Sequence, residues 1–252
     1  MVTGGNSGIG LGFARGAARA GGDIIIWGRR AGSNQAAAEE LRQYGGRVYT
    51  DSVDVSSENS VVRGMQNAVN EMGKIDCVFA NAGHATPVNS FRDLTDQQFR
   101  SLLDTNLHGA FYTLREGAKH MAQRAEAGEP GGSLVICGSS SILQGSPSMP
   151  HYAAAKGALA AMMKTIALDM GKFGVRVNMI IPGFIVTGMT TGSDRIDSEK
   201  AEQLETMMAK AAPLGRVGYP EDFEGIGAYL SSDASSFQTG TLLIIDGGRS
   251  VA

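Results

Sequence analysis

The sequence is poor in cysteine, and it has neither a long apolar run nor an excess of basic charge. Its two cysteines, Cys77 and Cys137, both lie within apolar runs, so no disulfide framework is expected and buried reduced thiols are the simpler interpretation. No apolar run approaches the roughly 18 residues of a membrane span. The N-terminus also lacks a charged segment followed by an apolar stretch. These absences predict a cytoplasmic protein with no membrane partner.

Other absences argue against whole classes of function. The formal net charge is −3 and no long cluster of lysine or arginine occurs, which argues against a nucleic-acid partner. The four histidines, His84, His108, His120 and His151, show no metal-binding spacing, so no metal site is expected. The absence of a GxSxG motif argues against a serine hydrolase. No Gly-Lys-Ser/Thr follows the first glycines, as a triphosphate-binding loop would require.

Short apolar runs alternate with helix-like segments along the whole chain. The expected strands cover 23–27, 47–52, 75–80, 133–137, 175–181 and 241–245, and the expected helices cover 11–20, 35–44, 57–72, 95–122, 151–172 and 221–231. Such alternation builds a parallel sheet with helices on both faces, and continuous apolar strands suit a sheet that is covered on both sides. Residues 1–252 show no linker or repeat, and we predict one α/β domain with a doubly wound, Rossmann-like parallel sheet.

A glycine-rich turn opens the chain. Gly4, Gly8 and Gly10 mark a tight strand-to-helix connection, where backbone N–H groups and the helix N-terminus can approach a pyrophosphate. The GxxxGxG spacing alone is weak evidence. Only three residues precede Gly4, whereas a buried strand normally needs about five. We therefore expect a truncated first strand, and we favour a native start upstream of Met1.

The stretch from Ser139 to Lys156 places a hydroxyl, a phenol and an ammonium together. Tyr152 and Lys156 are four residues apart in an alanine-rich run, so a helix there puts them one turn apart on one face. Ser139 follows an apolar run. Its neighbours Ser140 and Ser141 are also serines, so either of them is an alternative for the same position in the site. Tyrosine titrates near pH 10, and an ammonium about 4 Å away is worth roughly 4 kcal/mol, or about 3 pKa units, at an effective dielectric of 20. We therefore expect Lys156 to bring the pKa of Tyr152 toward neutrality.

Three further motifs stand in order with these elements: Asn81-Ala82-Gly83, Asn106 and Pro182-Gly183. In this combination the sequence resembles the short-chain dehydrogenases/reductases over essentially the whole chain. The resemblance implies an enzyme, an alcohol dehydrogenase or carbonyl reductase, in which Tyr152 is the general acid/base, Lys156 assists it and Ser139 polarises the carbonyl. It also implies that Asn106 holds a water that connects Lys156 to solvent, the alternative being a surface residue of a helix.

The resemblance also implies a nicotinamide cofactor. The residues that it assigns to cofactor binding are Gly4, Asn6, Ser7, Gly8, Ile9, Gly10, Arg29, Arg30, Asp54, Val55, Asn81, Ala82, Gly83, Tyr152, Lys156, Pro182, Gly183, Ile185 and Thr187. NAD-specific members carry an acidic residue at the end of the second strand, where this chain has Gly28. Arg29 and Arg30 follow, and a guanidinium can grip a 2′-phosphate through two charge-assisted hydrogen bonds. NADP(H) is therefore preferred, and use of either NADP(H) or NAD(H) is the alternative.

The candidate substrate pocket lies at the carboxyl edge of the sheet, where ligands bind in such folds. It consists of His84, Leu143, Met149, Phe184 and Met189, which are mostly apolar and suit a hydrophobic ketone or secondary alcohol as the small-molecule substrate. Residues 188–213 are polar at first and then helical, which suits a mobile lid. Small residues on outward helix faces, together with the family resemblance, predict a homotetramer.

Two other functions stay open. One is reduction of a 3-oxoacyl group on acyl carrier protein, because that subfamily is similar to this chain. The two arginines that meet the acidic carrier there align with Ser133 and Phe173, which leaves only Lys172 adjacent. The other is a non-catalytic NADP-binding sensor or scaffold, which would tolerate loss of Ser139, Tyr152 or Lys156.

Overall fold

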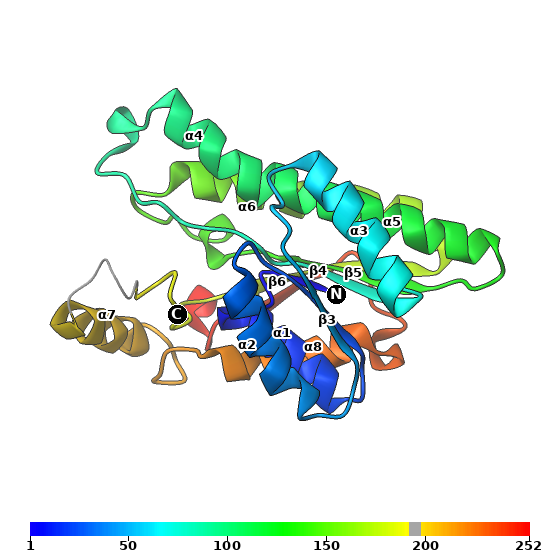
Figure 1. The fold of residues 1–252 in the computed structure, drawn as a ribbon. Helices are drawn as coiled ribbons and strands as arrows, with labels where there is room; N and C mark the ends of the chain where they lie inside the picture. Colours follow the sequence, from blue (N-terminus) through cyan, green and yellow to red (C-terminus); the bar gives the residue numbers. More distant parts are fainter. Residues whose placement is uncertain (192–197) are drawn as a thin grey trace.

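A seven-stranded parallel sheet forms the centre of the protein, as a computed structural model of residues 1–191 and 198–252 shows (Figure 1). The strands are β1 (Val2–Thr3), β2 (Ile24–Trp27), β3 (Val48–Asp51), β4 (Cys77–Ala80), β5 (Gly132–Cys137), β6 (Val175–Pro182) and β7 (Leu242–Ile245). They stand in the order β3-β2-β1-β4-β5-β6-β7. The order reverses between β1 and β4, and ligands of open α/β sheets bind at the carboxyl ends of strands at such a switch point.

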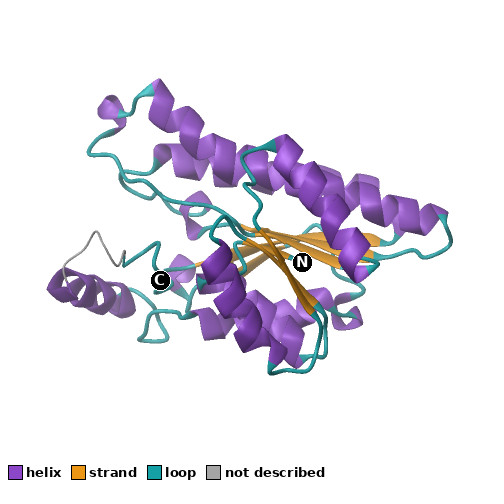
Figure 2. Ribbon diagram, viewed as in Figure 1, coloured by secondary structure: helices purple, strands orange, loops and turns teal. Residues whose placement is uncertain are grey.

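Helices cover both faces of the sheet (Figures 1 and 2). Their bounds are α1 (Gly8–Arg19), α2 (Ala31–Arg42), α3 (Glu58–Met72), α4 (Asp96–Leu103), α5 (Gly109–Glu126), α6 (Pro150–Met170), α7 (Ser198–Lys210) and α8 (Glu224–Ser231). One hydrophobic core lies between the sheet and α3, α5 and α6, and the other between the sheet and α1, α2 and α8. The predicted doubly wound α/β domain is confirmed.

The strands are buried on both faces because neighbouring residues feed different cores. Ile25 packs into the core under α3, α5 and α6, and Ile26 packs into the core under α1, α2 and α8. Trp27, the single tryptophan, ends β2 and is fully buried. Each such side chain contributes about 1.5–3 kcal/mol by leaving water, which explains why the strands read as uninterrupted apolar runs.

The structure differs from the sequence-based expectation in one long helix. The predicted helix over 95–122 is interrupted by a π-helical turn at Asp104–His108, which joins α4 to α5. Such turns hold one residue more than an α-helical turn and change the direction of the side chains that follow. The first strand is indeed short, two residues that pair with both β2 and β4.

The predicted lid lies partly outside the described residues. Of the range 188–213, residues 192–197 are not described, and α7 occupies much of the remainder. Within the described residues, no helix is long and apolar enough to cross a membrane.

Candidate active site

The glycine turn joins β1 to α1 at the switch point. Gly4 and Gly8 have positive φ angles of 63° and 54°, which favour glycine. A Cβ on Gly10 would lie 2.5 Å from the Asn81 Nδ2 atom and closer still to the Gly4 carbonyl oxygen, so no side chain fits there. The cap residue Ser7 makes no side-chain hydrogen bond to the first turn of α1. The N–H groups of that turn are therefore left for another acceptor, which fits a pyrophosphate.

Thr3 and Asn81 fasten the glycine turn to the end of β4. The Thr3 hydroxyl donates to the Phe79 carbonyl (3.3 Å) and accepts from the N–H groups of Asn81 and Ala82 (3.0 Å each). Asn81 Nδ2 donates to the carbonyl oxygens of Thr3 (3.0 Å) and Gly4 (3.3 Å). The predicted motif after β4 therefore lies directly beside the glycine turn.

The loop after β6 returns to the same turn. A Cβ on Gly8 would lie 3.2 Å from Thr187 Cγ2, so Thr187 lies against the turn, and Ile185 nearby is buried. Thr190 holds this loop, although sequence reasoning did not single it out. Its hydroxyl donates to the Ile185 carbonyl (2.7 Å) and accepts from the Thr187 N–H (2.9 Å). A threonine in a polar loop offers no signal for this role.

Gly28, Arg29 and Arg30 follow β2 at the same edge of the sheet. Both arginines are exposed, and neither forms an ion pair with any other described residue. Hydrogen bonds from Ser56, and to a smaller extent the charge of Arg29, lower the pKa of the Asp54 carboxyl. The other predicted cofactor residues also lie at this edge, in or just after the ends of strands or in the first turn of α1: Asn6, Ile9, Val55, Gly83, Pro182 and Gly183.

Ser139 lies just beyond the end of β5 and opens a short 3-10 turn. Its hydroxyl oxygen accepts from the Ser141 N–H (3.2 Å). α6 begins at Pro150, a residue suited to the first turn because it has no N–H to satisfy. Tyr152 lies in that first turn, and its side chain hydrogen-bonds with Ser139. The structure therefore brings the predicted serine and tyrosine together and favours Ser139 over its neighbours.

Lys156 lies one turn after Tyr152, as predicted, but its amine bonds a backbone carbonyl rather than the Tyr152 hydroxyl. Its Nζ atom donates to the Cys137 carbonyl oxygen (2.7 Å) and lies 5.6 Å from the centre of the Tyr152 ring. The side chain is only 4% exposed. Ser139, Tyr152 and Lys156 thus meet where β5 ends.

The predicted lowering of the tyrosine pKa is wrong for this structure. Burial, together with a smaller effect of Cys137, raises the pKa of Tyr152 above its ordinary value, against a smaller lowering by the hydrogen bond with Ser139. Burial likewise lowers the pKa of Lys156. Burial of the two groups, and not attraction between them, sets the direction of both pKa shifts. Tyr152 is therefore a protonated phenol at neutral pH.

Asn106 is fully buried in the π-helical turn, which excludes a surface position. Its Nδ2 donates to the carbonyl oxygens of His84 (3.0 Å) and Leu102 (3.1 Å). Its Oδ1 has no hydrogen-bond partner among the described residues. A Cβ on Gly83 would lie 2.5 Å from this Oδ1, so a glycine is required opposite Asn106.

The candidate substrate-pocket residues are more exposed than the residues around Lys156. Leu143 and Met189 are 43% and 49% exposed, and the others are partly buried: His84, Met149 and Phe184. The Val88 N–H donates to the Ser148 carbonyl (2.9 Å) and so ties the loop after β4 to the loop before α6. Ser148 has a φ of 65°, a strained value for a residue other than glycine, and sequence reasoning missed it.

Comparison with known proteins agrees with this geometry. A family model described as enoyl-(acyl carrier protein) reductase matches residues 4–250. The chain is a short-chain dehydrogenase/reductase. The solved structure of levodione reductase matches this short-chain dehydrogenase/reductase with a TM-score of 0.92 at 28% identity, covering 99% of this chain and 96% of that chain.

Two relatives show how widely such short-chain dehydrogenases/reductases differ in substrate. L-rhamnose 1-dehydrogenase (NAD(P)(+)) of Sphingomonas sp. (strain SKA58) is 34% identical over 252 residues, covering 100% of this chain and 95% of that protein. The 3-oxoacyl-(acyl-carrier-protein) reductase of Chlamydia pneumoniae is 36% identical over 248 residues, covering 98% and 95%. The protein is therefore an oxidoreductase of a family whose members use nicotinamide nucleotides, and neither relative fixes its substrate.

Proposed function

We propose that the protein interconverts a ketone and a secondary alcohol with NADP(H). The observation that carries the proposal is the meeting of Ser139, Tyr152 and Lys156 at the end of β5. A carbonyl that gains a hydride becomes an alkoxide, so the site must supply a proton and stabilise negative charge on oxygen. A hydroxyl, a protonated phenol and an amine are groups suited to that task.

The glycine turn fits the pyrophosphate of a dinucleotide, because glycine is required at Gly10 and the first turn of α1 has N–H groups without a side-chain cap. The glycine turn would hold the pyrophosphate, and Thr187 with Ile185 would hold the carboxamide end. When bound, the nicotinamide supplies or accepts a hydride at the carbonyl carbon.

Tyr152 donates the proton to the carbonyl oxygen in the reductive direction, since burial keeps its phenol protonated at neutral pH. The Ser139 oxygen accepts from the Ser141 N–H, and with substrate bound its own O–H would donate to the same carbonyl oxygen instead of to Tyr152. Lys156 stabilises the negative charge that appears on Tyr152 after transfer. We assign to Asn106 the fourth position, where its unpartnered Oδ1 binds a water that restores the proton.

The residues after β2 support NADP(H) over NAD(H). No carboxylate stands at Gly28, and the exposed guanidinium groups of Arg29 and Arg30 are available to a 2′-phosphate. A ribose with two free hydroxyls would meet no carboxylate at position 28. Use of both cofactors is the outcome that would weaken this part of the proposal.

The pocket supports a small, stand-alone substrate rather than a carrier-bound one. Ser133 is buried in β5, Phe173 is partly buried, and Lys172 is engaged with Asp169 (3.4 Å), so no basic cluster of described residues forms at these positions. Leu143 and Met189 supply an apolar wall. A hydrophobic ketone is therefore our first choice.

We also propose a homotetramer. Leu168 on α6 is 86% exposed and Ile244 on the edge strand β7 is 47% exposed, and burial of these apolar side chains against a second copy would stabilise the assembly. Light scattering tests this proposal, and a mass near that of one chain would contradict it.

The test of function is a panel of ketones, sugars, β-ketoesters and acyl thioesters, each assayed with NADPH and with NADH. Turnover of simple ketones with NADPH is the expected result. Turnover of acyl-carrier-protein thioesters alone would replace the proposal by the acyl reductase. Tight NADPH binding without turnover of any compound would favour a sensor.

A further inference from the structure

A buried amide ties three segments together beside β2. Asn34, in the first turn of α2, is 1% exposed. Its Nδ2 donates to the carbonyl oxygens of Gly28 (2.9 Å) and Asp51 (3.1 Å), and its Oδ1 accepts from Asn6 Nδ2 (2.7 Å). Both N–H groups and the carbonyl oxygen of the amide are therefore engaged. Displacing Asn34 leaves buried polar groups unpaired, at a cost of about 1–3 kcal/mol each.

This network determines what can stand at position 28. A Cβ on Gly28 would lie 2.5 Å from Asn34 Oδ1 and closer still to Asn6 Nδ2, distances that real side chains do not show. An aspartate at position 28 would add a repulsion between its carboxylate and the Asn34 carbonyl oxygen. Asn6 Nδ2 donates to Asn34 Oδ1, so replacing Asn34 removes one of the two atoms that a Cβ would meet and releases the other.

The same amide borders a cavity of about 460 Å³. The cavity is lined by the first turn of α2 and the end of β3, with Ala31, Gly32, Asn34, Gln35, Thr50, Asp51 and Ser52. The first turn of α2 carries no acidic residue, and Arg29 and Arg30 directly precede it. The Asp51 carboxylate accepts from Asn67 Nδ2 (3.2 Å).

We propose that Asn34 is a positioning residue that determines cofactor choice by excluding a ribose-binding carboxylate from position 28. With that carboxylate excluded, the two arginines are the charged groups that follow β2, and they select a 2′-phosphate. The proposal rests on the NADP(H) preference proposed above. It adds that a change of cofactor requires a change at Asn34 as well as at Gly28.

The test compares Gly28→Asp, Asn34→Ala and the double variant, using cofactor dissociation constants from calorimetry. Gly28→Asp alone should weaken NADPH binding without creating tight NADH binding, because the new side chain clashes. The double variant should bind NADH at least about tenfold more tightly than Gly28→Asp alone, because the freed space lets a carboxylate accept from the ribose hydroxyls. Tight NADH binding by Gly28→Asp alone would overturn the proposal, as would a double variant no better than the single one.

A double-mutant cycle with alanine in place of aspartate at position 28 tests the same clash if Gly28→Asp fails to fold. Gly28→Ala should lower the melting temperature by at least about 5 °C, and Asn34→Ala should lower it as well because buried carbonyls lose their donor. The loss in the double variant should be smaller than the sum of the two single losses, because the clash is removed. Gly225→Ala is the matched control, because a Cβ there meets nothing within 4 Å and Gly225 lies in α8, on an exposed helix face. Additive effects of Gly28→Ala and Asn34→Ala on the melting temperature would contradict the steric argument.

The cycle also separates this inference from the proposed function. If the wild-type protein binds NADH as tightly as NADPH, the cofactor preference proposed above fails. The coupling between positions 28 and 34 is still measured in that case by melting temperature alone. If the preference holds and the coupling is absent, the role of Asn34 alone is refuted.

Discussion

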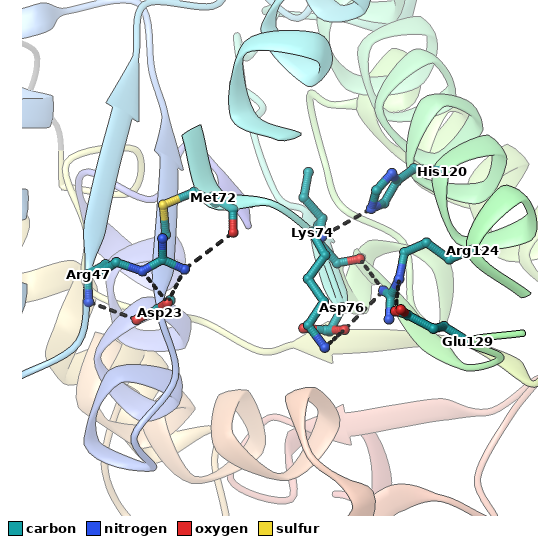
Figure 3. Close-up of polar contacts among 9 residues, drawn as sticks. Asp23, Arg47, Met72, Lys74, Asp76, His120, Arg124 and Glu129 are labelled. Carbon is teal, nitrogen blue, oxygen red and sulfur yellow. Dashed lines mark hydrogen bonds and ion pairs between the residues drawn. The ribbon is translucent and has the colours of Figure 1, made fainter. Parts of the chain in front are cut away.

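The basic side chains at the two edges of the sheet differ in the partners that they contact. At the amino-end edge, Arg47 forms an ion pair with Asp23 (2.8 Å) and donates to the Met72 carbonyl (3.3 Å), as Figure 3 shows. On the same edge Arg124 contacts Asp76 (3.0 Å). Each of these guanidinium groups meets a carboxylate of the same chain.

At the carboxyl-end edge Arg216 also pairs with a carboxylate, that of Asp222 (2.6 Å), but the basic side chains that follow β2 and β5 do not. Arg29 and Arg30 form no ion pair within the described part of the chain, and Lys156 contacts a backbone carbonyl rather than a carboxylate. Paired charges hold loops together but offer nothing to a ligand, whereas unpaired charges beside a crevice can bind one. The difference agrees with our proposal that the carboxyl-end edge binds cofactor and substrate, while ion pairs at the amino-end edge stabilise the fold.

Tyr152→Phe should have the largest effect at the carboxyl-end edge. The variant should lose at least about 10²–10³-fold in kcat for ketone reduction, because a general acid contributes about 10²–10⁴-fold. Cofactor affinity and melting temperature should stay near wild type, since only a hydroxyl is removed. Tyr112→Phe in α5 is the control. Retained reduction by Tyr152→Phe would refute the assigned proton donor.

Gly10→Ala should damage cofactor binding next most strongly. The added methyl meets the Gly4 carbonyl and Asn81 Nδ2, so the glycine turn must move. We expect NADPH affinity to fall at least about tenfold and the melting temperature to fall by about 5 °C, since overpacking costs about 1–3 kcal/mol. Calorimetry and thermal denaturation measure both effects. Unchanged NADPH affinity would show that the turn does not hold the cofactor.

At the opposite edge, Arg124→Met should reduce stability without reducing activity. The arginine side chain is 15% exposed, and it donates to the Ile75 carbonyl (3.2 Å) as well as to Asp76. We expect a loss of about 1–3 kcal/mol in the free energy of unfolding, read from denaturant titration. Arg100→Met, in an exposed pair with Asp96, should leave the free energy of unfolding nearly unchanged. A fall in kcat for Arg124→Met without a loss of stability would contradict the assignment of the amino-end edge to stabilising the fold.

The smallest of the expected effects is a contribution of His120 to the dependence of the unfolding free energy on pH. Its Nε2 accepts from the Ile75 N–H (3.1 Å), and burial, with a smaller contribution from Arg124, lowers the pKa of His120. The unfolded chain therefore binds a proton more readily, so His120 contributes stability above about pH 6.5 that is lost as pH falls toward the lowered folded value.

His120→Gln keeps an acceptor for the Ile75 N–H and does not titrate. The unfolding free energy of this variant should therefore change less than that of wild type between about pH 4.5 and pH 7.5. Denaturant titrations at several pH values measure the difference. Equal pH dependence in the two proteins would show that His120 is not the group responsible.

The parts of the site that could be predicted from sequence depend on local signals. The glycine turn needs Gly4, Gly8 and Gly10 whatever surrounds it, and the spacing of Tyr152 and Lys156 is a property of any helix. These features, in their order along the chain, were enough to predict the fold and the family. The functional roles of the residues stay predictions.

The rest depends on contacts between segments far apart in the sequence. The pKa of Tyr152 follows from burial that no local pattern reports, and Lys156 bonds the carbonyl of a residue 19 positions earlier. Asn34 resembles an ordinary residue of a polar helix start, and only the folded chain shows it between the glycine turn and β3. Long-range geometry therefore limits sequence reasoning here more than residue chemistry does.

The π-helical turn between α4 and α5 has a consequence for the direction of Asn106. The segment Asp104–His108 holds one residue more than a regular α-helical turn, and that extra residue directs Asn106 inward toward the His84 carbonyl. Deleting a single residue there would restore a regular helix and rotate everything before the deletion by about 100° relative to α5. A regular helix would therefore turn Asn106 away from the His84 carbonyl, so the placement of its buried side chain depends on the length of this one turn.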